Sequence, residues 1–143
     1  MRFRFRLLAI LIASLSASRM TGQAVPIRVL CICQQSDVDG HRMQKAIEDS
    51  ITLSERFALT QVAPFDVPKD GIVIEIHSLS IGMKDGHSIG SAMTIEALKP
   101  SPNDRGYFKQ VYEEQWVVPT DDPVSDTAVS YLASLRKKLV TAK

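Results

Sequence analysis

The sequence predicts an α+β fold: a two-layer sandwich with a five-stranded mixed sheet and two helices on one of its faces. Residues 71–81 alternate, with isoleucine at 72, 74 and 76 and mostly polar residues between, as in a strand with one buried face. Two other segments carry apolar residues every three or four positions, as amphipathic helices do. The expected order is β-α-β-β-β-α, which lets both helices cover the same face.

The first 24 residues have the order of a secretory signal peptide. Three arginines stand among the first six residues, an apolar run follows at 7–15, and small residues come next. The run is shorter than the roughly 20 residues that a membrane span needs. Cleavage is expected after Ser18 or after Ala24. We therefore expect one exported domain, residues 25–143, in the bacterial periplasm or secreted, with no membrane span once the leader is removed.

The charge balance argues against nucleic acid as a partner. The chain has 17 basic and 16 acidic residues, a formal charge of +1. Four of the basic residues are arginines in the leader, which leaves 13 basic and 16 acidic residues and a charge of −3. A mildly acidic domain without a basic stripe binds nucleic acid and anionic lipid poorly.

The first half of the domain reads as strand, helix, strand. Residues 27–33 are nearly all apolar, which predicts an interior strand covered on both faces. Ser36 or Asp37 is the expected N-cap of a helix over about 40–55, with Met43, Ile47 and Ile51 on its apolar stripe. A strand at 56–62 follows, and parallel pairing is the default for such a crossover.

The second half reads as three antiparallel strands and a helix. A polar turn at 82–87 contains Asp-Gly and leads into a strand at 88–99, in which Gly90 indicates close packing or a bulge. The next strand, 107–118, is stopped by Pro119. The last helix is expected to begin at Asp122 and Pro123. Its apolar stripe comprises Val124, Ala128, Tyr131, Leu132, Leu135 and Leu139.

The two cysteines, Cys31 and Cys33, are two positions apart in the first strand. In a regular strand such residues lie roughly 6.6 Å apart with parallel Cβ bonds, whereas bridged Cβ atoms lie roughly 3.5–4.5 Å apart. We expect two unbridged, small apolar residues that are shut away in the core. A redox or metal-binding Cys-x-Cys pair is the alternative.

The sequence lacks the motifs of common catalytic sites: Gly-x-Ser-x-Gly, the phosphate-binding glycine loops and His-Glu-x-x-His. His77 lies two residues from Glu75 on one strand face, but two ligands do not make a metal site. Glu75, Glu96 and Glu113 are expected to lie across neighbouring strands as part of a polar sheet face. We predict no catalytic residue, no metal and no cofactor.

One feature favours protein binding. The edge of a small sheet exposes backbone groups that can pair with a partner strand. The last strand carries Phe108, Tyr112 and Trp116, aromatic types that are enriched in interface cores, and its alternation places them with Val118 on one face. These three are the candidate binding residues, with packing against the helices as the alternative.

The helix and Phe-x-Leu strand within residues 47–62, the hairpin at 71–98 and the helix at 124–139 follow one order. This order resembles the amino-terminal domain of the periplasmic TolB translocation protein and small envelope proteins that carry such a domain alone. That domain is a protein-interaction module, not an enzyme. The resemblance implies a non-enzymatic exported domain that binds another envelope protein in assembly or transport. The alternative is a small exported redox or metal-dependent protein that uses Cys31 and Cys33, or His77 and Glu75. The oligomeric state stays open.

Overall fold

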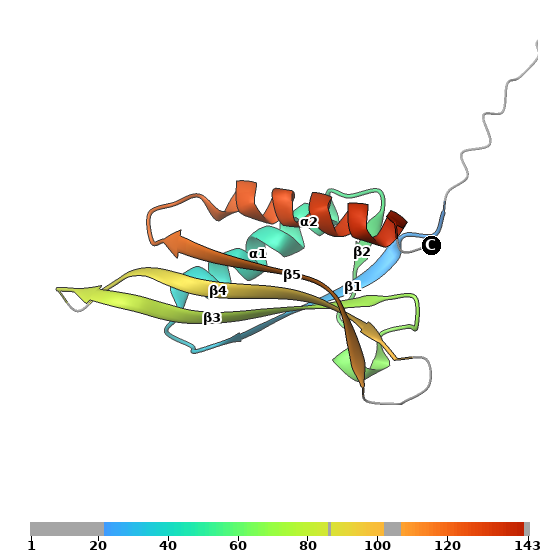
Figure 1. Cartoon of the computed structure of the whole chain (residues 1–143), viewed down its shortest axis with the longest axis horizontal. Coiled ribbons are helices and arrows are strands. Elements are labelled where there is room, and N and C mark those ends of the chain that lie inside the picture. The colour runs from blue at the N-terminus through green and yellow to red at the C-terminus, as the bar shows by residue number, and fades with distance from the viewer. Residues whose placement is uncertain (1–21, 86, 102–106, 142–143) are drawn as a thin grey trace, which may run out of the picture.

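The computed structural model describes residues 22–141 except residue 86 and residues 102–106, so most of the expected leader lies outside the described residues. Figure 1 shows the elements in chain order. They are β1 (Val25–Cys33), α1 (Val38–Thr52), β2 (Phe57–Leu59), the short 3₁₀ helix η1 (Pro64–Asp66), β3 (Ile72–Lys84), β4 (His87–Pro100), β5 (Phe108–Pro119) and α2 (Val124–Thr141).

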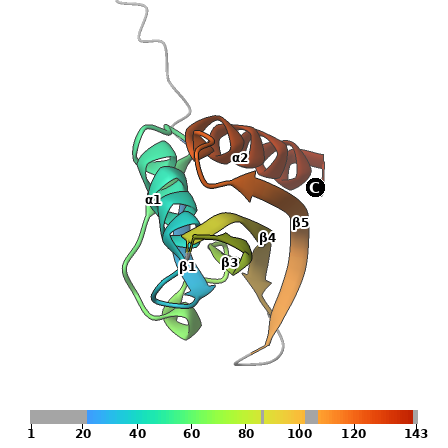
Figure 2. The same ribbon diagram turned by 90° about the vertical axis from the view of Figure 1, so that its left-hand side faces the viewer.

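The five strands form one mixed sheet in the order β2-β1-β3-β4-β5. β1 pairs in parallel with both β2 and β3, whereas β3, β4 and β5 form an antiparallel meander. Both helices lie on the same side of the curved sheet, and β5 rises toward α2 (Figure 2). The predicted two-layer α+β fold is therefore confirmed. No helix among the described residues is both long and apolar enough to cross a membrane.

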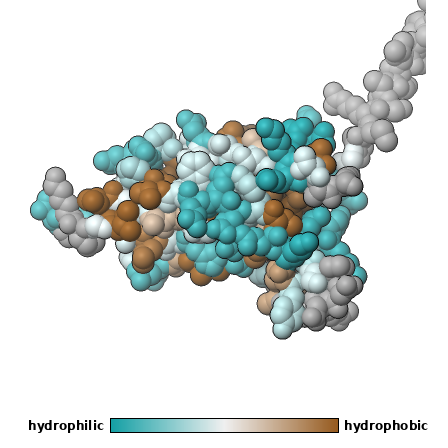
Figure 3. Space-filling view, viewed as in Figure 1, coloured by the Kyte–Doolittle hydropathy of each residue, from teal (hydrophilic) through white to brown (hydrophobic). Residues whose placement is uncertain are grey.

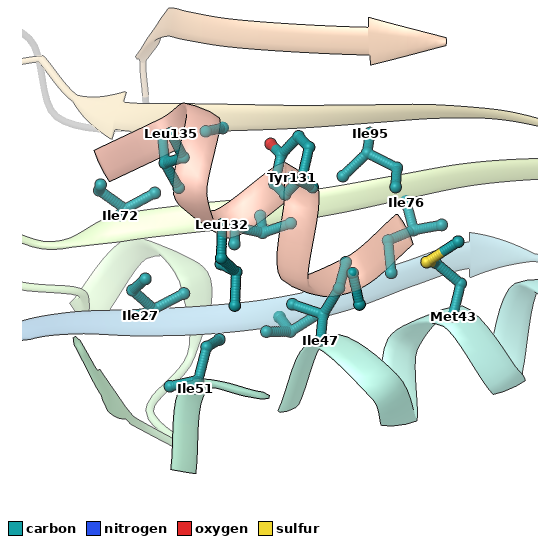
Figure 4. Packing of buried hydrophobic residues seen from close by; sticks show 14 of the residues in the cluster. Ile27, Met43, Ile47, Ile51, Ile72, Ile76, Ile95, Tyr131, Leu132 and Leu135 are labelled. Atoms are coloured by element: carbon teal, nitrogen blue, oxygen red, sulfur yellow. The ribbon is translucent and has the colours of Figure 1, made fainter. Parts of the chain in front are cut away.

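The core lies between the sheet and the helices. Figure 4 shows isoleucines of β1, β3 and β4 facing side chains of α1 and α2. All three predicted isoleucines of β3 are fully buried, as are the helix residues Met43, Ile47 and Leu135. The alternation and the two helical stripes thus identified the buried face, because burial of apolar area is what fixes strand and helix orientation.

The ends of several elements differ from the prediction. Asp37 is the N-cap of α1 and accepts a hydrogen bond from the Gly40 N–H, so the helix begins two residues earlier than expected. β2 has only three residues, where a seven-residue strand was expected. The hairpin strands extend further than predicted, to Lys84 and His87, and Asp85 lies in the left-handed region at φ 53°.

β1 is an interior strand, but the expectation that it is covered on both faces is wrong. Ile27 and Val29 point into the core and are fully buried, whereas Ile32 on the opposite face is 49 % exposed. Neither α1 nor α2 lies on that side of the sheet. An apolar run therefore indicated an interior position in the sheet and not a second covering layer.

The prediction that Phe108 shares a face with Tyr112, Trp116 and Val118 is also wrong. Ala97 pairs with Tyr112 but the next residue of β4, Leu98, pairs with Gln110, so one residue of β5 is bulged out. A bulge shifts the alternation by one. Phe108 therefore lies on the face away from the helices, where its ring contacts Phe65 of η1 at 5.8 Å between centroids.

Gly90 confirms the prediction of close packing. A Cβ atom at this position would lie 2.8 Å from the carbonyl oxygen of Val118 on the neighbouring strand. Only glycine lets the two backbones approach this closely.

Candidate functional site

The face of the sheet away from the helices carries side chains in rows that run across β3, β4 and β5. The strand register places Glu75 opposite Glu96 and Glu96 opposite Glu113. The predicted placement of these three glutamates across neighbouring strands is confirmed. The next row contains His77, Thr94 and Gln115, and the row beyond it contains Leu79, Ala92 and Val117. We call this surface the uncovered face.

The acidic row brings metal-ligating atoms together. His77 Nε2 lies 3.3 Å from Glu75 Oε2, as expected from their shared strand face. Ligand atoms of Glu75, His77 and Glu96 all lie within 4.8 Å of one another, and the three side chains are half-buried. The third glutamate, Glu113, is engaged differently: each of its oxygens accepts a hydrogen bond from a glutamine amide.

Those two amides come from the same strand. Gln110 Nε2 donates to one oxygen of Glu113 at 2.5 Å, and Gln115 Nε2 donates to the other at 3.1 Å. Donors on both oxygens fix the orientation of this carboxylate. The ligand set that converges is therefore one imidazole and two carboxylates, of which the sequence alone indicated Glu75 and His77.

The row beside it is apolar and exposed. Leu79 is 60 % and Val117 is 70 % exposed, and Ala92 lies between them. Figure 3 shows apolar surface gathered near the tip of the hairpin formed by β3 and β4, and hydrophilic surface over much of the middle of the same view. The uncovered face thus changes from acidic to apolar along the strands.

β5 forms one edge of the sheet, and its register shows which backbone groups face outward. Thr120 donates its N–H to the Ile89 carbonyl, 3.2 Å away, and the two residues lie directly opposite because Pro119 pairs with Gly90. Opposed residues on antiparallel strands alternate between pairs that share hydrogen bonds and pairs that do not. Between the bulge and Pro119, the residues of β5 whose backbone N–H and C=O point away from β4 are therefore Glu113, Gln115 and Val117.

The three candidate binding residues are not brought together. Tyr112 and Trp116 lie on the helix side of β5, half-buried and packed against the core. The ring of Tyr112 lies 5.4 Å from that of Tyr131 on α2, while Phe108 lies on the uncovered face. Tyr112 and Trp116 therefore follow the alternative prediction, because both pack against the core on the helix side of the sheet.

The expectation for the cysteines is wrong. Cys31 and Cys33 form a disulfide within β1, and both are half-buried and not enclosed. Their Cα atoms are 5.4 Å apart, closer than the roughly 6.6 Å of a regular strand and inside the range of bridged pairs. His41, on the first turns of α1, is exposed and places Nδ1 4.0 Å from Cys33 Sγ. Sequence spacing alone could not show this, because the local contraction of β1 is not encoded in a motif.

Buried carboxylates hold the beginning of α1 beside this disulfide. Asp37 and Asp39 are both buried, and the Ser91 hydroxyl lies within hydrogen-bond distance of both carboxylates, at 3.1 and 3.4 Å, where its one proton is shared between them. Asp39 also pairs with Arg42 at 3.0 Å and accepts from Thr120. The carboxylates therefore connect α1 to β4 and to the chain after β5. A groove of about 540 Å³ opens here, lined in part by His87, Ser88 and Thr120.

The charge of Asp37 is favoured in this environment. Burial by itself would raise the pKa of Asp37. The nearby Ser78 hydroxyl, the hydrogen bonds from the Gly40 N–H and Ser91, and the charge of His41 together outweigh burial and hold this pKa below its ordinary value of 3.8. Asp37 Oδ2 itself meets no donor at full hydrogen-bond geometry, although the Ser78 hydroxyl is near enough to favour the charged form.

Comparisons with known proteins give a distant likeness only. No family model matches the chain, and no curated protein matches it. Two solved structures of PelC dodecamers from Paraburkholderia phytofirmans, one of them a single-residue variant, are similar at 12 % identity and a TM-score of 0.43. The likeness covers 77 % of this chain and 83 % or 81 % of those chains. At this distance it assigns neither family nor function.

Proposed function

We propose that this chain is an exported, non-enzymatic domain that binds another protein of the cell envelope through the free edge of β5. The observation that carries the proposal is the outward set of backbone groups on Glu113, Gln115 and Val117, which no strand in the described part of the chain pairs. Such an edge accepts an extended segment of a partner, because backbone hydrogen bonds supply affinity and alternate side chains supply specificity.

The edge is protected at its ends and open in its middle. Lys109, the bulge after Gln110 and the final Pro119 are features that discourage pairing with other strands. The segment between the bulge and Pro119 has no lysine and no proline, but it carries Glu113 and Glu114 on opposite faces. Opposite charges across a strand pair are favourable, so the partner segment is extended and carries basic side chains.

Export and envelope location rest on the sequence. The leader pattern of residues 1–24 supports export, and the resemblance to the TolB amino-terminal domain supports a protein-interaction class. The non-enzymatic class rests on the same resemblance and on the lack of catalytic motifs in the sequence.

The test removes one outward N–H without removing a bond to β4. Proline at an outward position of an edge strand costs no ladder hydrogen bond. Wild type and Gln115→Ala, which keeps the N–H, are expected to capture the same protein from an envelope extract. Gln115→Pro is expected to lose that protein while its thermal unfolding midpoint stays close to that of wild type.

The captured protein is then purified and titrated against the wild type and both variants, because capture alone does not establish direct binding. If Gln115→Pro binds the captured protein as tightly as wild type does, the contact through the β5 edge is contradicted. If the wild type captures no specific protein, the proposed protein-binding function is contradicted. Light scattering of the pure chain shows whether the segment comes from a second copy, in which case wild type and Gln115→Ala self-associate and Gln115→Pro does not.

A second candidate function, thiol–disulfide exchange, is favoured by the disulfide itself. A three-residue loop removes little entropy from the unfolded chain, so Cys31–Cys33 contributes little as a structural staple. His41 lies beside Cys33, and a neighbouring imidazolium and a helix N-terminus both stabilise a thiolate. Both features suit a disulfide that is opened and reformed.

In this exchange a thiolate of a partner dithiol attacks one sulfur, breaks the S–S bond and forms a mixed disulfide. The second partner thiol resolves it, so the partner is oxidised and Cys31 and Cys33 are reduced by two electrons. Reaction of the oxidised protein with dithiothreitol is expected to be slower in His41→Ala than in wild type, with the exposed His87→Ala unchanged. Equal rates in all three would remove this role for His41.

A further inference from the structure

We propose that the uncovered face binds a divalent transition-metal cation through Glu75, His77 and Glu96. This site is separate from the backbone edge of β5 and does not depend on the protein contact proposed above. Two observations carry it: the charge of the acidic row, and the distances between the ligand atoms of the three side chains.

The first observation is uncompensated negative charge. Glu75, Glu96 and Glu113 lie directly opposite one another on three adjacent strands. Like charges directly opposite across strands are destabilising. Among the described residues the one ion pair found for this row is that of Glu75 with His77, which is charged only when protonated. A bound cation would compensate the negative charge of this row.

The second observation is the geometry of the ligand atoms. Zinc bonds to nitrogen and carboxylate oxygen are about 2.0–2.2 Å long, which makes tetrahedral ligand atoms roughly 3.4 Å apart. His77 Nε2 and Glu75 Oε2 are 3.3 Å apart. The oxygen of Glu96 lies within 4.8 Å of both, a gap that rotation of an unrestrained carboxylate closes.

The donor set selects the class of cation. Imidazole favours zinc, copper and nickel, whereas sites for calcium and magnesium use oxygen ligands alone. The three side chains come from two adjacent strands, β3 and β4, and are only half-buried, so water completes the coordination. A site open to solvent in this way exchanges its metal. The structure therefore assigns a zinc-type site and not a calcium site.

The test is calorimetric titration of the oxidised protein with zinc, manganese and calcium chlorides, without reducing agent. We expect one zinc per chain, weaker manganese binding and no calcium binding. Glu96→Gln and His77→Gln are each expected to weaken zinc binding at least about tenfold, since each removes a direct ligand. In the wild type, the side-chain nitrogen resonance of His77 is expected to shift on zinc addition.

Glu113→Gln is the matched control, because it makes the same change of charge in the same row. Its oxygens already accept from Gln110 and Gln115, so it is expected to keep most of the affinity. If Glu113→Gln weakens zinc binding as much as Glu96→Gln, zinc is held by the general negative charge of the row and not by the three proposed ligands. The disulfide keeps Cys31 and Cys33 from ligating, and loss of binding in His41→Gln instead of His77→Gln would place zinc elsewhere. Absence of zinc binding to the folded wild type overturns the proposal.

Discussion

At the scale of single residues, the carboxyl group of Asp37 is expected to make the stability of the fold depend on pH in acid. Its folded-state pKa lies below its ordinary value of 3.8, so its contribution to stability is full above that pH and is lost as the pH falls through the folded pKa. Asp37→Asn retains an N-capping side chain but loses the charge. We expect this change to lower the free energy of unfolding by about 1–3 kcal/mol at pH 7, and by clearly less at pH 3.

Urea unfolding of both proteins at the two pH values measures this difference. Asp49→Asn is the control, because Asp49 is an exposed acid on the same helix. It is expected to change stability by less than about 0.5 kcal/mol at either pH. A cost of Asp37→Asn that is the same at pH 3 and pH 7 would contradict a lowered pKa.

The opposite dependence of stability on pH is expected for Tyr131 at high pH. Its hydroxyl is buried beneath α2 without a hydrogen-bond partner, and burial first, then the nearby Glu114 and Glu96, raise its pKa. Stability from this group is complete below pH 10.0 and falls as the pH rises further. Tyr131→Phe is therefore expected to be as stable as wild type or up to about 1 kcal/mol more stable at pH 7.

The same substitution is expected to reduce the loss of stability between pH 9 and pH 11, measured by thermal unfolding at intervals of pH. Tyr107→Phe serves as the control, because Tyr107 is an exposed tyrosine of the same chain. A Tyr131→Phe variant that is less stable than wild type at pH 7 would mean that the hydroxyl finds a partner.

At the scale of single elements, the disulfide within β1 is expected to stabilise the fold only weakly. The loop-entropy relation gives about 1.6 kcal/mol for a three-residue loop, against about 3 kcal/mol for a 15-residue loop. Reduction is therefore expected to leave the domain folded, with a free energy of unfolding lower by less than about 2 kcal/mol. Urea unfolding with and without reductant measures this, and unfolding on reduction alone would contradict it.

The elements also show what sequence could and could not predict. Burial of apolar area sets a local period, so Ile74 in β3, Ile47 in α1 and Leu135 in α2 were placed correctly. Phe108 was misplaced, because a bulge depends on pairing between strands and leaves no mark in the alternation. Glu96 was expected in the same row as Glu75 but was not recognised as a third ligand of the proposed metal site, because a single sequence gives no distances between side chains on different strands.

At the scale of the molecule, the two helices share one core, and this predicts a single cooperative transition. Leu135 of α2 and Ile47 of α1 are both fully buried in the same cluster between helices and sheet. Leu135→Ala and Ile47→Ala are each expected to cost about 2–5 kcal/mol. Trp116, the one tryptophan of the chain, lies half-buried on the side of β5 that faces the helices, so its fluorescence reports on the packing of α2.

In both variants the fluorescence of Trp116 and the far-ultraviolet circular dichroism are expected to change at the same urea concentration, because coincident transitions mark two-state unfolding. If α2 were instead an independently stable layer, Leu135→Ala would shift the fluorescence transition to lower urea. The dichroism transition of α1 and its strands would stay at its wild-type urea concentration. Ile47→Ala would then shift the dichroism alone. Coincidence in both variants is what a sheet with one covered face requires, since removal of either helix exposes the core that the other one shares.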